Sequence, residues 1–168
     1  MSLHIVFQKP SIAENIGNII RTCVGFGAEL HMIRPYGFIW NPSKIARSST
    51  NHMDQCVIHQ YDDWEEFYAA THHDNSEYYF YTRYGKKAPS DFHYDLTSKD
   101  IYLVFGNEHY GIDKDILKAH LDTCVRIPMT SDLICLNVAN SAAIAAYEVV
   151  KQNNYPNLEL EEIFNKEW

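Results

Sequence analysis

The chain has 168 residues, of which 46% are hydrophobic and 21% are charged. These values are typical of one globular domain with its own core, so they exclude disordered and fibrous classes. No apolar run is long enough to span a bilayer, and the first residues lack the basic and apolar regions of a signal peptide. The four cysteines form no CxxC pair, which favours a cytoplasmic protein with reduced thiols and no zinc site.

The net charge is −8, from 14 Lys and Arg against 22 Asp and Glu. Nucleic-acid-binding proteins usually carry an excess of basic residues, so a role on RNA or DNA requires a local basic patch. Acidic residues are concentrated at 62–66 and in the tail from Glu159 onward. We interpret both acidic clusters as solvated surface.

Short apolar runs alternate with helical patterns along the chain. Strands are predicted at 3–7, 30–33, 56–59, 78–82, 101–105 and 124–127, and helices at 15–26, 64–70, 112–120 and 136–152. This alternation predicts an α/β fold in which helices cover both faces of a parallel sheet. Ligands of such sheets bind beyond the carboxyl ends of the strands. Segment 83–99 lacks periodicity and is predicted to be a surface loop.

The first segment that could carry chemistry is Asn15-Ile16-Gly17-Asn18-Ile19-Ile20-Arg21. Helical spacing places Glu14, Gly17, Asn18 and Arg21 on one stripe opposite the isoleucines. Asn15 could be only an N-cap, and Arg21 only a surface cation. A glycine is costly inside a helix, so the segment suggests that another group approaches the backbone here.

The second segment is Phe105-Gly106-Asn107-Glu108-His109-Tyr110-Gly111, which reads as a strand end, a turn and a helix start. Gly106 is predicted to let a ligand approach the backbone, with amide groups facing it. Glu108 could serve only as a helix cap. The turn is neither GxGxxG nor a P-loop, and by itself it is a weak signal.

The third segment runs from Arg126-Ile127-Pro128-Met129 to Leu136-Asn137-Val138-Ala139-Asn140-Ser141. Two asparagines at helical spacing near a helix start suggest more than a cap. The alanines of the following helix could let another backbone pack closely, or they could be ordinary core. The nine histidines show no HExxH or HxxxH spacing, so no metal site is predicted, and the lack of GxSxG excludes a hydrolase elbow.

In this order, the three segments resemble the three motifs of the SPOUT class of RNA methyltransferases. The resemblance covers about residues 3–158 and is closest to the TrmL-like branch of the TrmH family, whose members are single domains of this size. His4-Ile5-Val6-Phe7-Gln8-Lys9-Pro10 and Leu30-His31-Met32-Ile33-Arg34-Pro35 also resemble the first two strands of that branch. One SPOUT domain is therefore expected over residues 1–168.

The resemblance implies a deep trefoil knot in the C-terminal half, S-adenosylmethionine bound in the knot, and an obligate homodimer. It implies 2′-O-methylation of RNA, with the wobble nucleotide of a tRNA (cytidine or uridine 34) as the first choice and ribosomal RNA as an alternative. Neither a metal nor a membrane is implied. Cofactor contacts are expected from Tyr81, Thr82, Gly106, Gly111, Ile127, Met129, Cys135 and Leu136.

Four residues match the family's catalytic positions: Asn15, Arg21, Glu108 and Asn137. The family's motif 1 arginine is assigned to activation of the ribose hydroxyl. A guanidinium stays protonated, so a phosphate clamp that orients the ribose is the physically preferred role for Arg21. Glu108 is expected to hold the cofactor loop or pair with Arg21, and the two asparagines to fix the site by hydrogen bonds. Candidate RNA contacts are Arg47, Arg83, Lys86 and Lys87.

The chain departs from the family at several motif positions. Ile134, Cys135 and Ala139 stand where the family commonly has arginine, serine and serine, and residues 47–52 read Arg-Ser-Ser-Thr-Asn-His instead of Arg-Ala-Gly-Leu-Asp-Tyr. One alternative is therefore a SPOUT-fold protein that binds RNA or cofactor without catalysis. The other is a nicotinamide-dependent Rossmann enzyme, which the missing GxGxxG and strand-end acid disfavour.

Overall fold

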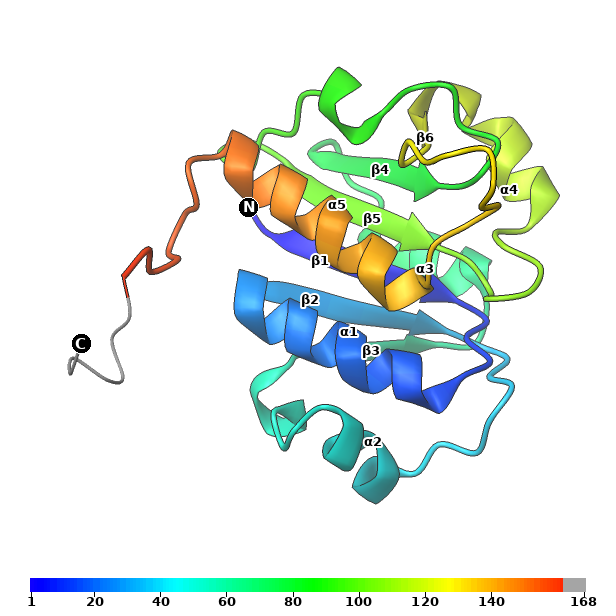
Figure 1. Ribbon diagram of the computed structural model, residues 1–168, viewed down its shortest axis with the longest axis vertical. Coiled ribbons are helices and arrows are strands. Elements are labelled where there is room, and N and C mark those ends of the chain that lie inside the picture. The colour runs from blue at the N-terminus through cyan, green and yellow to red at the C-terminus, as the bar shows by residue number, and fades with distance from the viewer. Residues whose placement is uncertain (162–168) are drawn as a thin grey trace.

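The computed structural model describes residues 1–161, which are built around one six-stranded parallel sheet (Figure 1). The strands lie in the order β3-β2-β1-β5-β4-β6, and every pairing is parallel. β1 is buried along its whole length, as expected for a central strand covered on both faces. The six strands have the bounds β1 Leu3–Gln8, β2 Ala28–Ile33, β3 Ile58–Tyr61, β4 Ser76–Tyr81, β5 Asp100–Phe105 and β6 Cys124–Val125.

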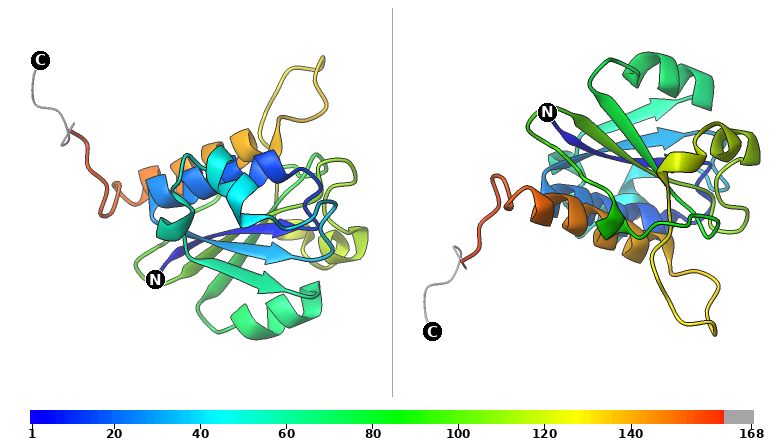
Figure 2. Two further views of the ribbon diagram at one scale, coloured as in Figure 1. Left: turned by 90° about the horizontal axis from the view of Figure 1, so that it is seen from below. Right: turned by 90° about the horizontal axis from the view of Figure 1, so that it is seen from above.

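Helices cover both faces of this sheet, which confirms the predicted α/β architecture (Figure 2). One face carries α1 (Ala13–Phe26), α2 (Pro42–Ser48) and α5 (Val138–Gln152), and the other carries α3 (Trp64–Thr71) and α4 (Lys114–Ala119). Side chains alternate between the two faces along each strand. Ile5 accordingly belongs to the hydrophobic cluster under α1 and α5, and Val6 to the cluster with Phe67 of α3.

The alanine-rich helix α5 packs against α1, as the two helices lie side by side over the sheet. Ala142, Ala145 and Ala146 are fully buried in the same cluster as Ile16 and Ile19 of α1. Small side chains let the two helices approach closely. The core interpretation of these alanines is therefore confirmed, and they are not available to a second chain.

The connection after β4 lies against both edges of β6. Val125 pairs with Tyr81 of β4 in the sheet, and it also forms a bridge with Lys87 on its other side. The Arg126 N–H donates to the Lys87 carbonyl at 2.9 Å. A Cβ on Gly85 would lie 2.5 Å from the Val125 carbonyl carbon, so only glycine lets this segment pass so close to β6. The chain between Thr82 and Lys87 thus passes around the strand.

Several boundaries differ from the predicted ones. α2 was not predicted, because its seven residues are too few to show a clear period. β3 begins two residues later than expected, since pairing with β2 sets its register from Ile58. β6 ends at Val125, where the chain leaves the sheet for the long segment 126–137 (Figure 2). No helix among the described residues is long and apolar enough to cross a membrane.

Candidate active site

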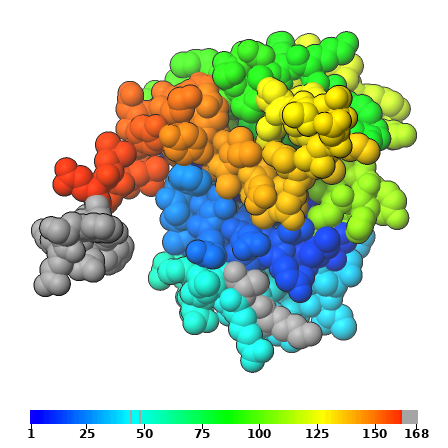
Figure 3. Space-filling model, in the orientation of Figure 1, coloured from blue at the N-terminus to red at the C-terminus, as the bar shows by residue number. Residues whose placement is uncertain are grey.

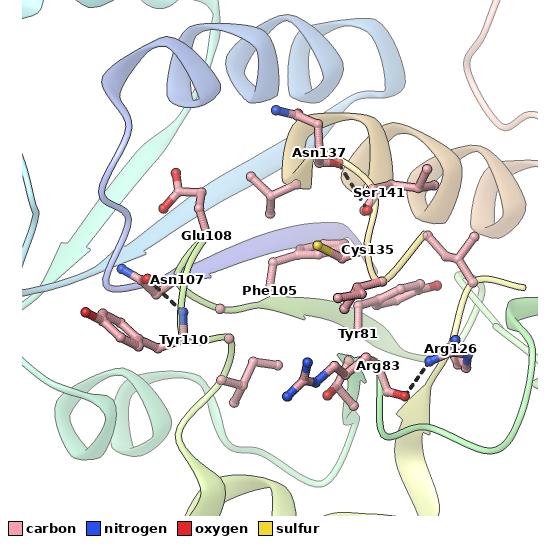
Figure 4. A pocket seen from close by; sticks show the side chains of 18 of the residues that line it. Tyr81, Arg83, Phe105, Asn107, Glu108, Tyr110, Arg126, Cys135, Asn137 and Ser141 are labelled. Atoms are coloured by element: carbon pink, nitrogen blue, oxygen red, sulfur yellow. Dashed lines mark hydrogen bonds between the residues drawn. The ribbon is translucent and has the colours of Figure 1, made fainter. Parts of the chain in front are cut away.

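A pocket of about 650 Å³ lies beyond the carboxyl ends of β4, β5 and β6 (Figure 4). Its volume is in the range of small-molecule sites. Four stretches that are distant in the sequence form its walls: 81–84, 105–112, 125–129 and 134–138. They include parts of the second and third motif segments, and Asn15 adds the first.

Asn15 joins the three motif segments through side-chain hydrogen bonds. It is buried on α1, and its Nδ2 donates to Glu108 Oε1 at 3.0 Å. Its Oδ1 accepts from Asn137 Nδ2, also at 3.0 Å. Asn15 is not the N-cap of α1, since Ile12 occupies that position. Its amide therefore links the start of α1 to the two loops of the pocket.

Glu108 stabilises the beginning of α1, a helix almost a hundred residues earlier in the chain. Its carboxylate accepts from the backbone N–H of Ser11 (2.8 Å) and Ile12 (3.1 Å) and from the Ser11 hydroxyl (2.6 Å). Burial alone would raise the pKa of this carboxyl, but the hydrogen bonds from Ser11 and Asn15 outweigh burial and leave the pKa below its ordinary value. Glu108 is therefore ionised at neutral pH, and a carboxylate suits a helix N-terminus.

Asn137 begins α5 as its N-cap. Its Oδ1 accepts from the backbone N–H of Ala139 at 2.9 Å and of Asn140 at 3.4 Å, while its Nδ2 is used by Asn15. The oxygen of the Asn137 amide thus caps α5, while the nitrogen of the same amide bonds to Asn15 of motif 1. This is the reason for an asparagine here, because an aspartate would lack the donor.

The loop after β5 is held in shape by its own backbone and by Asn107. Asn107 and Gly111 exchange two backbone hydrogen bonds, and the Asn107 side chain donates to the Lys9 carbonyl at 2.7 Å. A Cβ on Gly106 would lie 2.1 Å from the backbone of Gly111 and Ile112. The backbone of Gly111 and Ile112 therefore occupies the place where a side chain of residue 106 would begin, so only glycine fits at this turn. The role of Asn107 was missed, although an asparagine after a glycine turn is a signal for such a loop.

The inner surface of the pocket is largely apolar. Tyr81 stacks on Phe105 with ring centroids 4.9 Å apart, and Ile127 and Met129 extend this surface. Cys135 is exposed and lines the pocket, so its thiol is not core packing (Figure 4). All the residues that were expected to contact the cofactor line this pocket: Tyr81, Thr82, Gly106, Gly111, Ile127, Met129, Cys135 and Leu136.

Two predicted functional cations lie elsewhere. Arg21 is on the exposed side of α1 and does not line the pocket. It forms no ion pair with Glu108, whose hydrogen-bond partners are at the start of α1. Arg47 lies on α2, which packs on α1 and is likewise absent from the pocket lining. Arg83 does line the pocket, whereas Lys86 and Lys87 line an adjoining groove.

Histidines meet on the α3 face of the sheet, a juxtaposition that the sequence spacing did not indicate. Ligand atoms of His4, Glu29 and His31 lie within 4.8 Å of one another. His4 Nδ1 is 3.0 Å from His31 Nε2, and His31 Nδ1 is 2.9 Å from the Tyr61 hydroxyl. Burial lowers the pKa of His4, and it lowers the pKa of His31 to about 2. Both imidazoles are therefore neutral at pH 7 and hydrogen-bonded to each other.

The fold and the pocket define a parallel α/β protein whose ligand site is built from loops beyond β4, β5 and β6. A model of the SpoU rRNA methylase family matches residues 2–147. The chain belongs to this family.

Known proteins resemble the chain over nearly its whole length. A protein of Geobacillus stearothermophilus with the provisional name tRNA (cytidine(34)-2′-O)-methyltransferase is 36% identical over 158 residues, which are 94% of this chain and 99% of the relative. A structure that describes the 2-OH methylation of C/U34 on tRNA is 28% identical, with a TM-score of 0.83 over 91% of this chain and 97% of that chain. The SpoU methyltransferase AviRb of Streptomyces viridochromogenes, solved with AdoMet, is 26% identical, with a TM-score of 0.79 over 91% of this chain and 58% of its own.

Proposed function

We propose that the chain transfers a methyl group from S-adenosylmethionine to the ribose 2′-hydroxyl of the wobble nucleotide, cytidine or uridine 34, of a tRNA. The observation that carries this proposal is the hydrogen-bonded contact of Asn15, Glu108 and Asn137, which joins three motif segments beside one pocket. The relatives named for methylation of nucleotide 34 support this choice of substrate. A tRNA substrate also implies that the protein works in the cytoplasm.

The walls of the pocket suit S-adenosylmethionine. Tyr81, Phe105 and Ile127 offer apolar surface to an adenine ring, and the loops at 106–111 and 126–136 offer backbone groups to its polar edge. AviRb, of the same family, was solved with this cofactor. We assign cofactor contacts to the eight pocket residues named above. When bound, the cofactor supplies a methyl carbon activated by its sulfonium.

We further propose that the protein is a homodimer in which Arg21 of one protomer faces the pocket of its partner. Arg21 lies about 9 Å along α1 from Asn15, outside its own pocket. The exposed sides of α1 and α5 adjoin on one face of the molecule (Figure 3), where α5 leaves Ile144 43% and Tyr147 49% exposed. Covering such side chains is favourable. A second copy of the chain on this face would bring its Arg21 to the pocket, which has no cation from motif 1 of its own chain among its described lining residues.

The protein's own residues then have separate tasks. Arg21 holds the phosphate next to the target ribose, since a guanidinium binds phosphate oxygens in a bidentate way. Asn15, Glu108 and Asn137 are positioning residues, because they fix the pocket loops to α1. These residues would contribute to the rate by aligning the hydroxyl with the methyl donor. The hydroxyl proton leaves to a phosphate oxygen or a water molecule.

The proposal also takes residues 1–168 as one SPOUT domain with a trefoil knot. The two pairings of Val125, with Tyr81 and with Lys87, support a knot, since the chain after β4 passes around β6. Residues 126–137 then return toward α1 and close the pocket.

Methylation of total tRNA, followed by mass mapping of 2′-O-methylated nucleotides, tests the function. The expected product is one added methyl group on the ribose of nucleotide 34. Methylation of ribosomal RNA alone would overturn the tRNA assignment. Calorimetric titration with S-adenosylhomocysteine and with NAD tests the cofactor separately, and binding of NAD instead would overturn the methyltransferase assignment.

A further inference from the structure

Basic residues are concentrated around the pocket and a groove beside it, in a chain that is acidic as a whole. Among the described residues, six Lys and Arg side chains line these two hollows, against two acidic residues, Glu108 and Asp122. The rest of the chain holds eight cations and twenty acids. The six are Arg83, Lys86, Lys87, Lys114, Lys118 and Arg126.

The groove has a volume of about 530 Å³ and two walls from different parts of the chain. Lys86 and Lys87 come from the segment that passes around β6, and Lys114 and Lys118 come from α4. The α4 pair lies one helical turn apart, so both ammonium groups share one side of the helix. Sequence patterns indicated the Lys86 and Lys87 pair only, because the α4 pair has the spacing of an ordinary solvated helix face.

These lysines have little internal charge to neutralise them. Lys118 pairs with Asp115 at 3.0 Å, and both side chains are well exposed. Lys87 Nζ lies 5.3 Å from the centre of the Phe92 ring. Within residues 1–161, no ion pair engages Lys86 or Lys114. The groove therefore offers four donors to an external anion.

The groove adjoins the pocket directly, since Tyr84 and Leu117 line both. Tyr84 is 58% exposed and stays beside Arg83, whose Nη2 donates to its hydroxyl at 2.6 Å. A strand whose nucleotide enters the pocket would pass over Tyr84 into the groove. Exposed Leu121 and the lysine stems give the groove apolar surface as well as charge.

We propose that this groove, walled by Lys86 and Lys87 on one side and by Lys114 and Lys118 of α4 on the other, binds the phosphodiester backbone of the RNA next to the target nucleotide. The inference rests on the proposed function, because the occupant is the strand that the pocket methylates. Lysines act as point charges on flexible stems, so the groove holds the backbone without reading bases. Its shared wall with the pocket favours RNA over an acidic peptide.

The test uses the full-length double variant Lys114→Gln/Lys118→Gln in a fluorescence anisotropy titration of labelled tRNA at several salt concentrations. Loss of two exposed charge contacts is expected to weaken binding roughly five- to ten-fold. The slope of log affinity against log salt should fall by about 1.5, since each phosphate contact contributes roughly 0.7–0.9. Thermal unfolding and S-adenosylhomocysteine affinity should stay unchanged.

The matched control is Lys99→Gln/Lys151→Gln, which removes the same charge at two positions that do not line the groove. Lys99 pairs with Glu77, and Lys151 pairs with Glu148. The proposal requires that this control keep wild-type affinity and salt slope. If the two double variants weaken tRNA binding equally, the effect is one of net charge, and the proposal that the groove binds RNA is overturned. Unchanged tRNA binding by the α4 variant, with an active wild type, would also overturn it. A wild type that methylates no RNA would instead refute the proposed function.

Discussion

Cys135 is the residue at which the pocket differs most informatively from the family pattern. Its thiol is free, exposed and lines the pocket. A thiol is a weak donor, whereas a serine hydroxyl both donates and accepts. The chain therefore forgoes the polar contacts that a serine hydroxyl could make at this point.

Cys135→Ser is expected to tighten S-adenosylhomocysteine binding or raise turnover by several-fold, because one neutral hydrogen bond contributes about 1 kcal/mol. Calorimetry and a tRNA methylation assay measure the two effects. Cys56→Ser is the control, since Cys56 does not line the pocket. Identical affinity and rate in wild type and Cys135→Ser would mean that the backbone makes all polar contacts there.

Buried His31 gives the stability of the fold a specific pH dependence. Its folded-state pKa of about 2 lies far below the unfolded value of 6.5, so the unfolded chain binds more protons below pH 6.5. Stability is thus complete above pH 6.5 and decreases as the pH falls, by up to about 1.4 kcal/mol per pH unit. Urea unfolding at pH 7.5, 6.5 and 5.5 should show this decrease.

His31→Gln removes the buried imidazole and should flatten this dependence, whatever its effect on stability at pH 7.5. His73→Gln changes an exposed histidine and should leave the slope as in the wild type. A slope that is equally steep in His31→Gln would assign the pH dependence to other groups. His4, whose pKa burial also lowers, would be the first of these.

At the scale of elements, periodicity predicted every strand and four of the five α-helices within residues 1–161, because each of these buries an apolar face large enough to leave a pattern. The short helix α2 was not predicted, since among its described side chains Ile45 alone is large and fully buried. Within the site, the pocket-lining residues were predicted through motif resemblance. The contacts of Glu108 with Ser11 were not predicted, because hydrogen bonds across 97 residues leave no local signal. The position of Arg21 outside its own pocket could not be predicted either. Helical spacing shows which residues share a face of the helix, but not what that face contacts.

Gly106 controls the shape of the loop between β5 and α4. Gly106→Ala would place a Cβ 2.1 Å from backbone atoms of Gly111 and Ile112, so the loop must move. We expect a loss of about 1–3 kcal/mol in unfolding free energy and weaker S-adenosylhomocysteine binding. Chemical denaturation and calorimetry measure these effects.

Gly25→Ala is the matched control for this substitution. Gly25 lies in α1, and a Cβ there would meet nothing within 4 Å. Alanine should stabilise the helix by up to about 1 kcal/mol and leave cofactor binding unchanged. Wild-type affinity in Gly106→Ala would show that the loop can shift without cost to the pocket.

At the scale of the whole molecule, the proposed dimer with Arg21 acting across the interface can be separated from action within one protomer. Arg21→Ala lacks the cation, and Cys135→Trp fills the pocket, so each variant alone should lose methyl transfer. A mixed dimer should regain part of the activity, because the open pocket of one protomer faces the intact Arg21 of the other. Sedimentation at micromolar concentration should give twice the mass of one chain.

The mixing experiment has two outcomes that would contradict this arrangement. If mixed variants stay inactive while exchange of subunits is shown by tagged pull-down, Arg21 acts in its own protomer. If the protein sediments as a monomer and remains active, no partner is needed. Both variants are expected to fold, because Arg21 and Cys135 are both exposed. Thermal unfolding checks this expectation.

The path of the chain around β6 also decides how the sheet can associate with others. A parallel sheet normally ends in two strands with unpaired backbone groups, which can recruit further strands and seed aggregates. Here the outer edge of Val125 is occupied by Lys87, and the lysines beside it add repulsion between copies. In the described chain, the remaining open edge is β3, which has only four residues. The segment between Thr82 and Lys87, which forms part of the pocket wall, thus also prevents the β6 edge from pairing with strands of other molecules.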